Sequence, residues 1–146
     1  MQTRFIIYFT AVMMMLCNLL HAANLPLSDE RSKHVINDVV LPFLDALKNG
    51  DVDLIKHYIA GEIYENKRVL LENNEEYPEF LRSYYQDVEF YIEKVVESVD
   101  YIEVHVVIEF SNGDEINAKL CLIKDMNKVS GPLEGAAWKI VEFGYK

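Results

Sequence analysis

Hydrophobic positions in the first half of the chain recur at helical spacing. Apolar residues between positions 28 and 49 repeat every three or four places, which predicts one helix with a single apolar stripe. Ser28 before two acids is typical of a helix start, and Pro42 predicts a kink because it removes one backbone hydrogen bond. We expect Gly50 to end this helix in the left-handed conformation and Asp51 to cap a second helix. The stripe consists of Val35, Ile36, Val39, Val40, Phe43, Leu44 and Leu47.

The helical segments that follow are shorter and less regular. The second helix is expected to bury Leu54, Ile55, Tyr58 and Ile59. Residues 64–87 show a weaker pattern, because Asn73 and Asn74 interrupt them. Pro78 can open another short helix. Its apolar stripe would contain Phe80, Leu81, Tyr84 and Tyr85.

The second half of the chain changes to a period of two, which predicts β-strands. The expected strands are residues 88–97, 101–110, 115–124 and 136–143. The second of them places Ile102, Val104, Val106, Ile108 and Phe110 on one face. Helices first and strands afterwards predict an α+β domain, in which N-terminal helices pack on a curved antiparallel sheet of about four strands.

The turn between the second and third strands sets their register. A two-residue turn at Asn112-Gly113 would mix apolar and polar side chains on each face. A three-residue loop over residues 111–113 puts Gly113 where a left-handed residue is required and gathers the apolar side chains on one face. We therefore expect the three-residue loop, which pairs Ile108 with Ile116, Val106 with Ala118, and Val104 with Leu120.

Residues 1–22 have the features of a secretory signal peptide: a basic start, an almost wholly apolar run over residues 5–20, and small residues after it. The run is short for a transmembrane helix, which needs about 20 apolar residues. Cys17 follows a large residue, so we interpret it as part of the signal and not as a lipid attachment site. We expect cleavage after Ala22, which leaves residues 23–146 as a single secreted or periplasmic domain; an uncleaved signal anchor is the alternative.

The mature chain would be strongly acidic. The sequence has 14 basic and 24 acidic residues, for a net charge of −10, and loss of Arg4 with the signal would make it −11. This charge repels nucleic acid and anionic lipid, so we expect neither as a partner, and no stable membrane insertion after cleavage. The simplest interpretation of the charge is a soluble surface.

Cysteine and histidine contents exclude several kinds of site. Cys121 would be the single cysteine of the mature chain, so no intramolecular disulfide is possible. His34, His57 and His105 share no metal-ligand spacing, so we expect no metal. No motif indicates a cofactor, and we expect none.

Residues 43–64, FLDALKNGDVDLIKHYIAGEIY, resemble the opening of the nuclear transport factor two-like (NTF2-like) superfamily, in which a Gly-Asp turn joins two helices. The later segments FSNGDE, KLCLIK and WKIVEF resemble small secreted members. The resemblance covers most of residues 32–143 and implies a cone-like α+β fold. The superfamily contains isomerases, dehydratases and non-enzymatic binding modules, so the fold leaves the function open. The matching positions are Leu44, Leu47, Gly50, Asp51, Leu54 and Tyr58.

The inward face predicted for the sheet offers no carboxylate for acid–base catalysis, which needs a group within reach of the substrate. His105 would lie opposite Lys119 on the outer face, so we interpret it as a surface residue. His57 falls between buried positions and is expected on a helix flank. The candidate ligand-binding residues are therefore aromatic, with a purely structural core role as the alternative. They are Tyr58, Tyr84, Tyr85, Tyr91 and Trp138.

The outer face of the predicted sheet is partly apolar. Val107, Cys121 and Ile123 interrupt its polar residues. A half-apolar sheet face often packs against a second subunit, and members of the NTF2-like superfamily commonly dimerise in this way. These three residues form the candidate homodimer face, and scattered surface apolar residues are the alternative.

Three functions are compatible with the sequence. The first is a secreted, non-catalytic module that binds a small apolar ligand or a protein partner through the cone cavity or the outer sheet face. The second is an isomerase- or dehydratase-like enzyme with tyrosine or histidine in the pocket, which requires an inward-pointing acid such as Glu62 or Asp87. The third is an inhibitory or immunity-type protein that uses its acidic surface against a basic partner. We favour the binding module over the enzyme.

Overall fold

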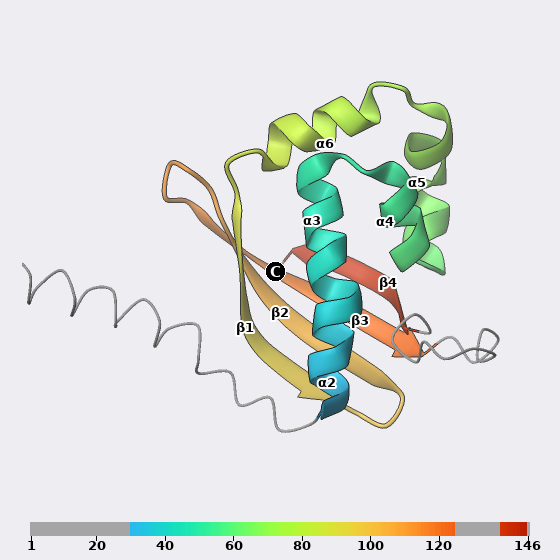
Figure 1. Ribbon diagram of the computed structural model, residues 1–146, viewed down its shortest axis with the longest axis vertical. Coiled ribbons are helices and arrows are strands. Elements are labelled where there is room, and N and C mark those ends of the chain that lie inside the picture. The colour runs from blue at the N-terminus through green and yellow to red at the C-terminus, as the bar shows by residue number, and fades with distance from the viewer. Residues whose placement is uncertain (1–29, 125–137, 146) are drawn as a thin grey trace, which may run out of the picture.

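The computed structural model of the protein describes residues 30–124 and 138–145 (Figure 1). The signal peptide expected over residues 1–22 and the helix start expected at Ser28 lie outside these ranges. In the part of the chain that the structure describes, no helix has the length and apolar character needed to cross a membrane. The helices are α2 (Glu30–Val35), η1 (Ile36–Val40), α3 (Leu41–Asn49), α4 (Val52–Tyr58), α5 (Glu62–Asn73) and α6 (Tyr77–Tyr85).

Four antiparallel strands follow the helices and form one curved sheet in the order β1-β2-β3-β4 (Figure 1). The strands are β1 (Glu89–Glu97), β2 (Tyr101–Glu109), β3 (Glu115–Lys124) and β4 (Trp138–Tyr145). This arrangement confirms the predicted α+β class, with N-terminal helices packed on an antiparallel sheet. The first three strands lie within one residue of their predicted bounds, and the expected start of the fourth at residues 136 and 137 lies outside the described ranges.

The first three helical elements run on as one rod that crosses the inner face of the sheet (Figure 1). Instead of a simple kink at Pro42, the rod contains a π-helical turn, η1, directly before it. The backbone N–H of Leu41 donates to the carbonyl of Ile36, five residues earlier. A proline ring collides with the carbonyl four residues before it in an α-helix, and the wider turn makes room for the ring.

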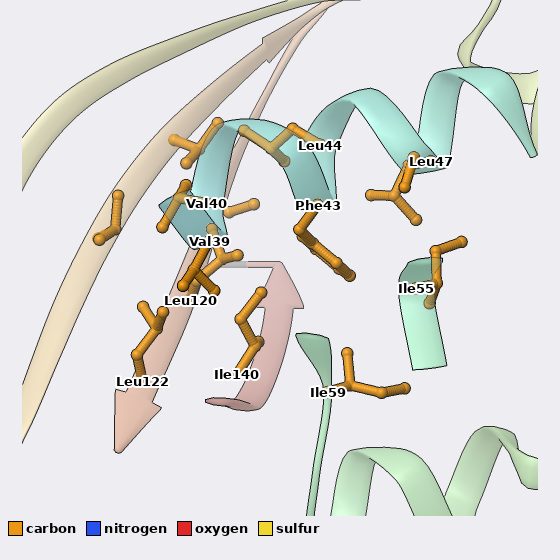
Figure 2. Close-up of a cluster of buried hydrophobic side chains, with 14 of the residues drawn as sticks. Val39, Val40, Phe43, Leu44, Leu47, Ile55, Ile59, Leu120, Leu122 and Ile140 are labelled. Atoms are coloured by element: carbon orange, nitrogen blue, oxygen red, sulfur yellow. The ribbon is translucent and has the colours of Figure 1, made fainter. Parts of the chain in front are cut away.

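The core lies between this rod and the sheet. Figure 2 shows Val39 and Val40 of the rod gathered with Leu120 and Ile140 of the sheet. Each fully buried Leu or Ile stabilises the fold by roughly 1.5–3 kcal/mol. Phe110 and Ile116, next to the turn between β2 and β3, are half-buried. The other inward side chains of β2 and β3, together with Ile140 of β4, are buried, as the alternation predicted: Ile102, Val104, Val106, Ile108, Ala118, Leu120, Leu122 and Ile140.

The turn between β2 and β3 has the predicted three-residue form. Phe110 and Asp114 close the loop with a backbone bond of 2.9 Å, and the N–H of Gly113 donates to the carbonyl of Phe110 at 2.8 Å. Gly113 has the left-handed φ of 85° that this loop requires. The register is the expected one, with Ile108 opposite Ile116, Val106 opposite Ala118, and Val104 opposite Leu120.

Helices α4 and α5 pack beside β4, and α6 packs on α3 and leads across the rod to β1 (Figure 1). Helix α4 begins at the predicted cap, where the Asp51 carboxylate accepts from the N–H of Leu54 at 3.0 Å. The chain then extends at Ile59, which bridges to Ile140, and the N–H of Ala60 donates to the carbonyl of Ile140 at 3.0 Å. This edge contact sets the position from which α5 starts.

Helix α5 is more regular than its sequence indicated. Residues 64–73 form the greater part of a 12-residue helix, where we expected weak order. Most of its side chains are exposed, and Leu71 is its one buried residue. A helix with one buried residue gives little periodic signal in its sequence. Packing of α5 against β4 stabilises the helix instead.

At Gly50, the end of α3 approaches the backbone of α6 closely. It ends α3 in the predicted left-handed conformation, with φ of 64°, and the next N–H, of Asp51, donates back to Ala46 at 2.9 Å. A Cβ atom at this position would lie 2.2 Å from the carbonyl oxygen of Pro78 in α6. Only glycine satisfies both the conformation and the contact.

We expect Gly50→Ala to lower the free energy of unfolding by roughly 3 kcal/mol, because backbone strain adds to a collision with another helix. Gly113→Ala is the matched control: it has the same sign of φ, but its Cβ would meet nothing within 4 Å. The control should cost only about 1 kcal/mol. Urea unfolding of the three proteins measures the difference, and equal losses would contradict a role for the Pro78 contact.

Candidate functional site

A pocket of about 130 Å³ lies at the β4 end of the molecule, between the helices and the last strand. All four of α3, α4, α5 and α6 contribute to its wall, together with Ile59 and β4. Figure 2 shows Phe43, Leu47, Ile55 and Ile59 directed toward this region from three separate segments. The pocket therefore depends on the fold as a whole and not on one local motif.

Helices α3, α5 and α6 present residues to the pocket that are four positions apart, which places them on one face of each helix. Helix α3 contributes Phe43 and Leu47, and β4 contributes Phe143 and Tyr145 from one side of the strand. The ring of Phe143 meets that of Phe43 edge to face at 5.8 Å, which joins α3 to β4 at the pocket. Helices α5 and α6 each add a stripe of three residues: Ile63, Lys67 and Leu71, and Tyr77, Leu81 and Tyr85.

Four of the twelve described side chains that line the pocket carry polar groups, and none of the twelve is acidic. They are the ammonium of Lys67 and the hydroxyls of Tyr77, Tyr85 and Tyr145. The remaining lining is aliphatic or phenyl. Such a site can bury an apolar molecule and offer it a few hydrogen bonds, which is the usual composition of a small-molecule pocket.

Two of the three tyrosine hydroxyls lie close together in the pocket. The hydroxyl oxygens of Tyr85 and Tyr145 are 3.4 Å apart. Burial raises the pKa of Tyr85 strongly, and the hydrogen bond to Tyr145 adds to the shift. Burial also raises the pKa of Tyr77. Tyr77 and Tyr85 consequently stay protonated at neutral pH, where each can donate a hydrogen bond to a ligand.

One of the five aromatic residues predicted to bind a ligand lines this pocket. Tyr85 does, as part of the α6 stripe. Tyr84, next to it, points outward and is 41% exposed, and Tyr91 is exposed on the other side of β1. Tyr58 is half-buried against the core, and Trp138 is buried with the guanidinium of Arg31 lying 6.0 Å from its ring centre.

Three further lining residues, Tyr77, Tyr145 and Lys67, were not predicted from the sequence. Tyr77 lies four positions before Leu81 and eight before Tyr85, so the stripe of α6 could have been extended back to it. Lys67 lies four positions from both Ile63 and Leu71, which is the signal that it shares their face. Tyr145 carries no such signal, because its place depends on how far β4 extends beside α6.

The residues considered for acid–base chemistry lie elsewhere. His57 is on the exposed flank of α4, as predicted, with its ring 5.1 Å from that of Tyr58, and its backbone carbonyl accepts from the Lys139 ammonium. Glu62 is exposed in the first turn of α5, and Asp87 is exposed after α6. Neither carboxylate is among the lining side chains, so the pocket as described brings no acid to a bound molecule.

The outer face of the sheet carries a charged cluster at its centre. His105 lies opposite Lys119, as predicted. The His105 Nε2 atom is 2.6 Å from a carboxylate oxygen of Glu103, and the Lys119 ammonium lies 3.3 Å from Glu142 and 3.6 Å from Glu103. The hydrogen bond from His105 holds the pKa of Glu103 below its usual range. Lys119 thus lies between two carboxylates on the side of the sheet away from the pocket.

The candidate homodimer residues lie around this cluster. Ile123 is 41% exposed, and Val107 and Cys121 are half-buried on the same face. Cys121 is a free thiol whose pKa is raised by burial. Two further exposed aromatic residues, Tyr91 and Tyr101, extend the apolar surface along β1 and β2.

Among residues 30–124 and 138–145, no group of three His, Cys, Asp or Glu side chains is arranged to hold a metal ion. The acids are instead distributed over the helices, the strands and the turns that the structure describes.

No protein-family model matches the chain, and a search of curated proteins finds no match. A search of solved structures finds the 2.00 Å crystal structure of a Campylobacter jejuni protein described as an NTF2-like transpeptidase. The match has a TM-score of 0.46 and 17% sequence identity, and it covers 68% of this chain and 91% of that one. The identity and the TM-score are too low to transfer a family or an activity to this chain.

Proposed function

We propose that the protein is a non-catalytic module that binds a small apolar ligand in the pocket between α3, α4, α5, α6 and β4. The observation that supports this most directly is a pocket lined by aliphatic and phenyl groups, with three tyrosine hydroxyls and one ammonium as its described polar groups. Apolar walls supply affinity, and a few placed polar groups orient the ligand.

The size of the pocket limits the ligand. Its volume of about 130 Å³ is close to that of an engineered cavity of about 150 Å³ that accepts benzene. A molecule with one small ring, or a short branched chain, fits this space. Steroids and long acyl chains exceed it, so we exclude them as fully enclosed ligands.

The enzyme alternative has less support. Isomerisation or dehydration by acid–base catalysis needs a carboxylate or imidazole within hydrogen-bond reach of the substrate. The twelve described lining residues include neither. Burial raises the pKa values of Tyr77 and Tyr85, so both hydroxyls stay protonated and neither supplies a base. The same residues suit a site that binds without reacting.

Binding of toluene tests the pocket, observed through the methyl signals of Leu47, Ile59 and Leu71 by NMR. We expect Ile63→Trp to abolish the shifts, because the indole would occupy the space. Val69→Trp is the matched control on the same helix: Val69 is 67% exposed and does not line the pocket, so its variant should bind normally. Wild-type methyl signals that do not respond to saturating toluene would contradict the proposal.

We also propose that the protein acts outside the cytoplasm after removal of residues 1–22, on the basis of the apolar run and the small residues that follow it. The intact mass of protein purified from the envelope or medium of its own host tests this. We expect a chain that begins at Ala23. A mass that includes Met1 would favour the uncleaved anchor, and recovery from the cytoplasm alone would contradict export.

The outer sheet face is proposed as a homodimer contact. Its exposed apolar residues lie on both sides of the internally paired charge cluster, so two copies could bury them without leaving those charges unmatched. Gel filtration with light scattering should give a dimer at micromolar concentration, and Ile123→Asp should reduce it to a monomer. Val69→Asp, an equal change on exposed α5, should leave the dimer intact. A monomeric wild-type protein would contradict the proposal.

A further inference from the structure

The charge of the pocket is opposite to that of the protein. The chain has a net charge of −10, with 24 acidic residues among 146. Within the described part of the chain, the pocket lining contains one formal charge, and it is the positive charge of Lys67. A positively charged ligand site in a protein this acidic suggests that the ligand is an anion.

Lys67 occupies a position that the helix pattern would assign to an apolar residue. It lies four residues after Ile63 and four before Leu71, in the middle of the α5 stripe that faces the pocket. Its side chain is exposed, so the methylene groups can line the pocket while the ammonium remains hydrated near the opening.

Acidic residues of α5 are placed away from Lys67. The helix positions three and four residues on either side of it are Ile63, Tyr64, Leu70 and Leu71, none of which is acidic. The nearby acids have other partners: Glu65 lies 3.4 Å from the Arg68 guanidinium, and Glu72 accepts from the Tyr64 hydroxyl. No acid of α5 therefore lies one helical turn from Lys67 on the face that lines the pocket.

The other polar groups of the lining are able to donate to an anion. Tyr77, Tyr85 and Tyr145 present phenolic hydroxyls, and a carboxylate is an acceptor at all of its oxygen lone pairs. Hydrogen bonds from neutral donors to a charged acceptor are stronger than those between neutral groups.

We infer that the ligand is a small monocarboxylate with an apolar ring or branched chain, held with its tail among the aliphatic walls and its carboxylate by Lys67. This rests on the proposed function of the same pocket and adds the charge of the ligand to it. The volume of about 130 Å³ restricts the apolar part to about the size of one benzene ring.

Three probes that share a phenyl ring and differ in charge test this: phenylacetate, phenylacetamide and 2-phenylethylammonium. Titrations of the full chain at pH 7, followed by NMR, should rank them in that order of affinity. We expect phenylacetate to bind about tenfold more tightly than the amide, the ratio that corresponds to one charge-assisted hydrogen bond. The cation should bind least tightly.

Lys67→Gln should weaken phenylacetate about tenfold and leave phenylacetamide within about twofold, because only the anion uses the charge. Lys67→Met keeps most of the stem and serves as the second variant should the first unfold, as judged by circular dichroism. Arg68→Gln is the matched control, since it removes the same charge from the next position of α5, where the side chain pairs with Glu65 and does not line the pocket.

The outcomes separate this inference from the proposed function. Equal affinities for phenylacetate and phenylacetamide, or equal effects of the Lys67 and Arg68 variants, would overturn the inference that the ligand is a carboxylate. If toluene still bound, the proposed apolar ligand-binding function would stand. Binding by none of the phenyl probes would overturn the carboxylate inference. Failure of toluene as well would overturn the ligand-binding function itself.

Discussion

Burial of the apolar inner face of β2 and β3 is the constraint on which the rest of the structure depends. That face consists of side chains that are almost fully buried, and the rod formed by α2, η1 and α3 covers it. A slip of one residue at the turn before Asp114 would exchange this face for the one that carries Glu103, His105 and Lys119. Placing those charges beneath the rod would cost far more than any single contact contributes, so the turn and the burial select the same register.

The pocket follows from how the remaining helices meet this central layer. The rod occupies the middle of the sheet, α4 and α5 lie beside β4, where Ile59 and Ala60 contact the strand, and α6 packs on α3. Aromatic and branched side chains converge there from five elements, and their shapes leave a space. The close approach of Gly50 to Pro78 fixes α6 relative to α3, which holds two walls of that space at a constant separation.

The sequence pattern predicted those parts of the fold that are determined by residues close together in the sequence. The first three strands, the loop over residues 111–113, the Gly50 end and the Asp51 cap each depend on a few neighbouring residues, and each was found as expected. The fourth strand extends two residues beyond its predicted end, to Tyr145. Helix α5 was underestimated because its stripe contains Lys67 between two apolar residues. The pocket was recognised only through Tyr85, since its lining is assembled from segments distant in the sequence. No periodicity within one segment reports which tyrosines of α6 and β4 will meet.

Both edges of the open sheet are interrupted, each in a different way, and this affects how copies of the chain would associate. On the β4 side, the extended backbone at Ile59 and Ala60 already occupies the hydrogen-bonding groups of Ile140. On the β1 side, the register shifts between Ile92 and Lys94, which interrupts the flat ladder that an added strand would need. Neither edge is a continuous template, so growth of stacked β-ribbons is disfavoured even though four strands lie in one open sheet.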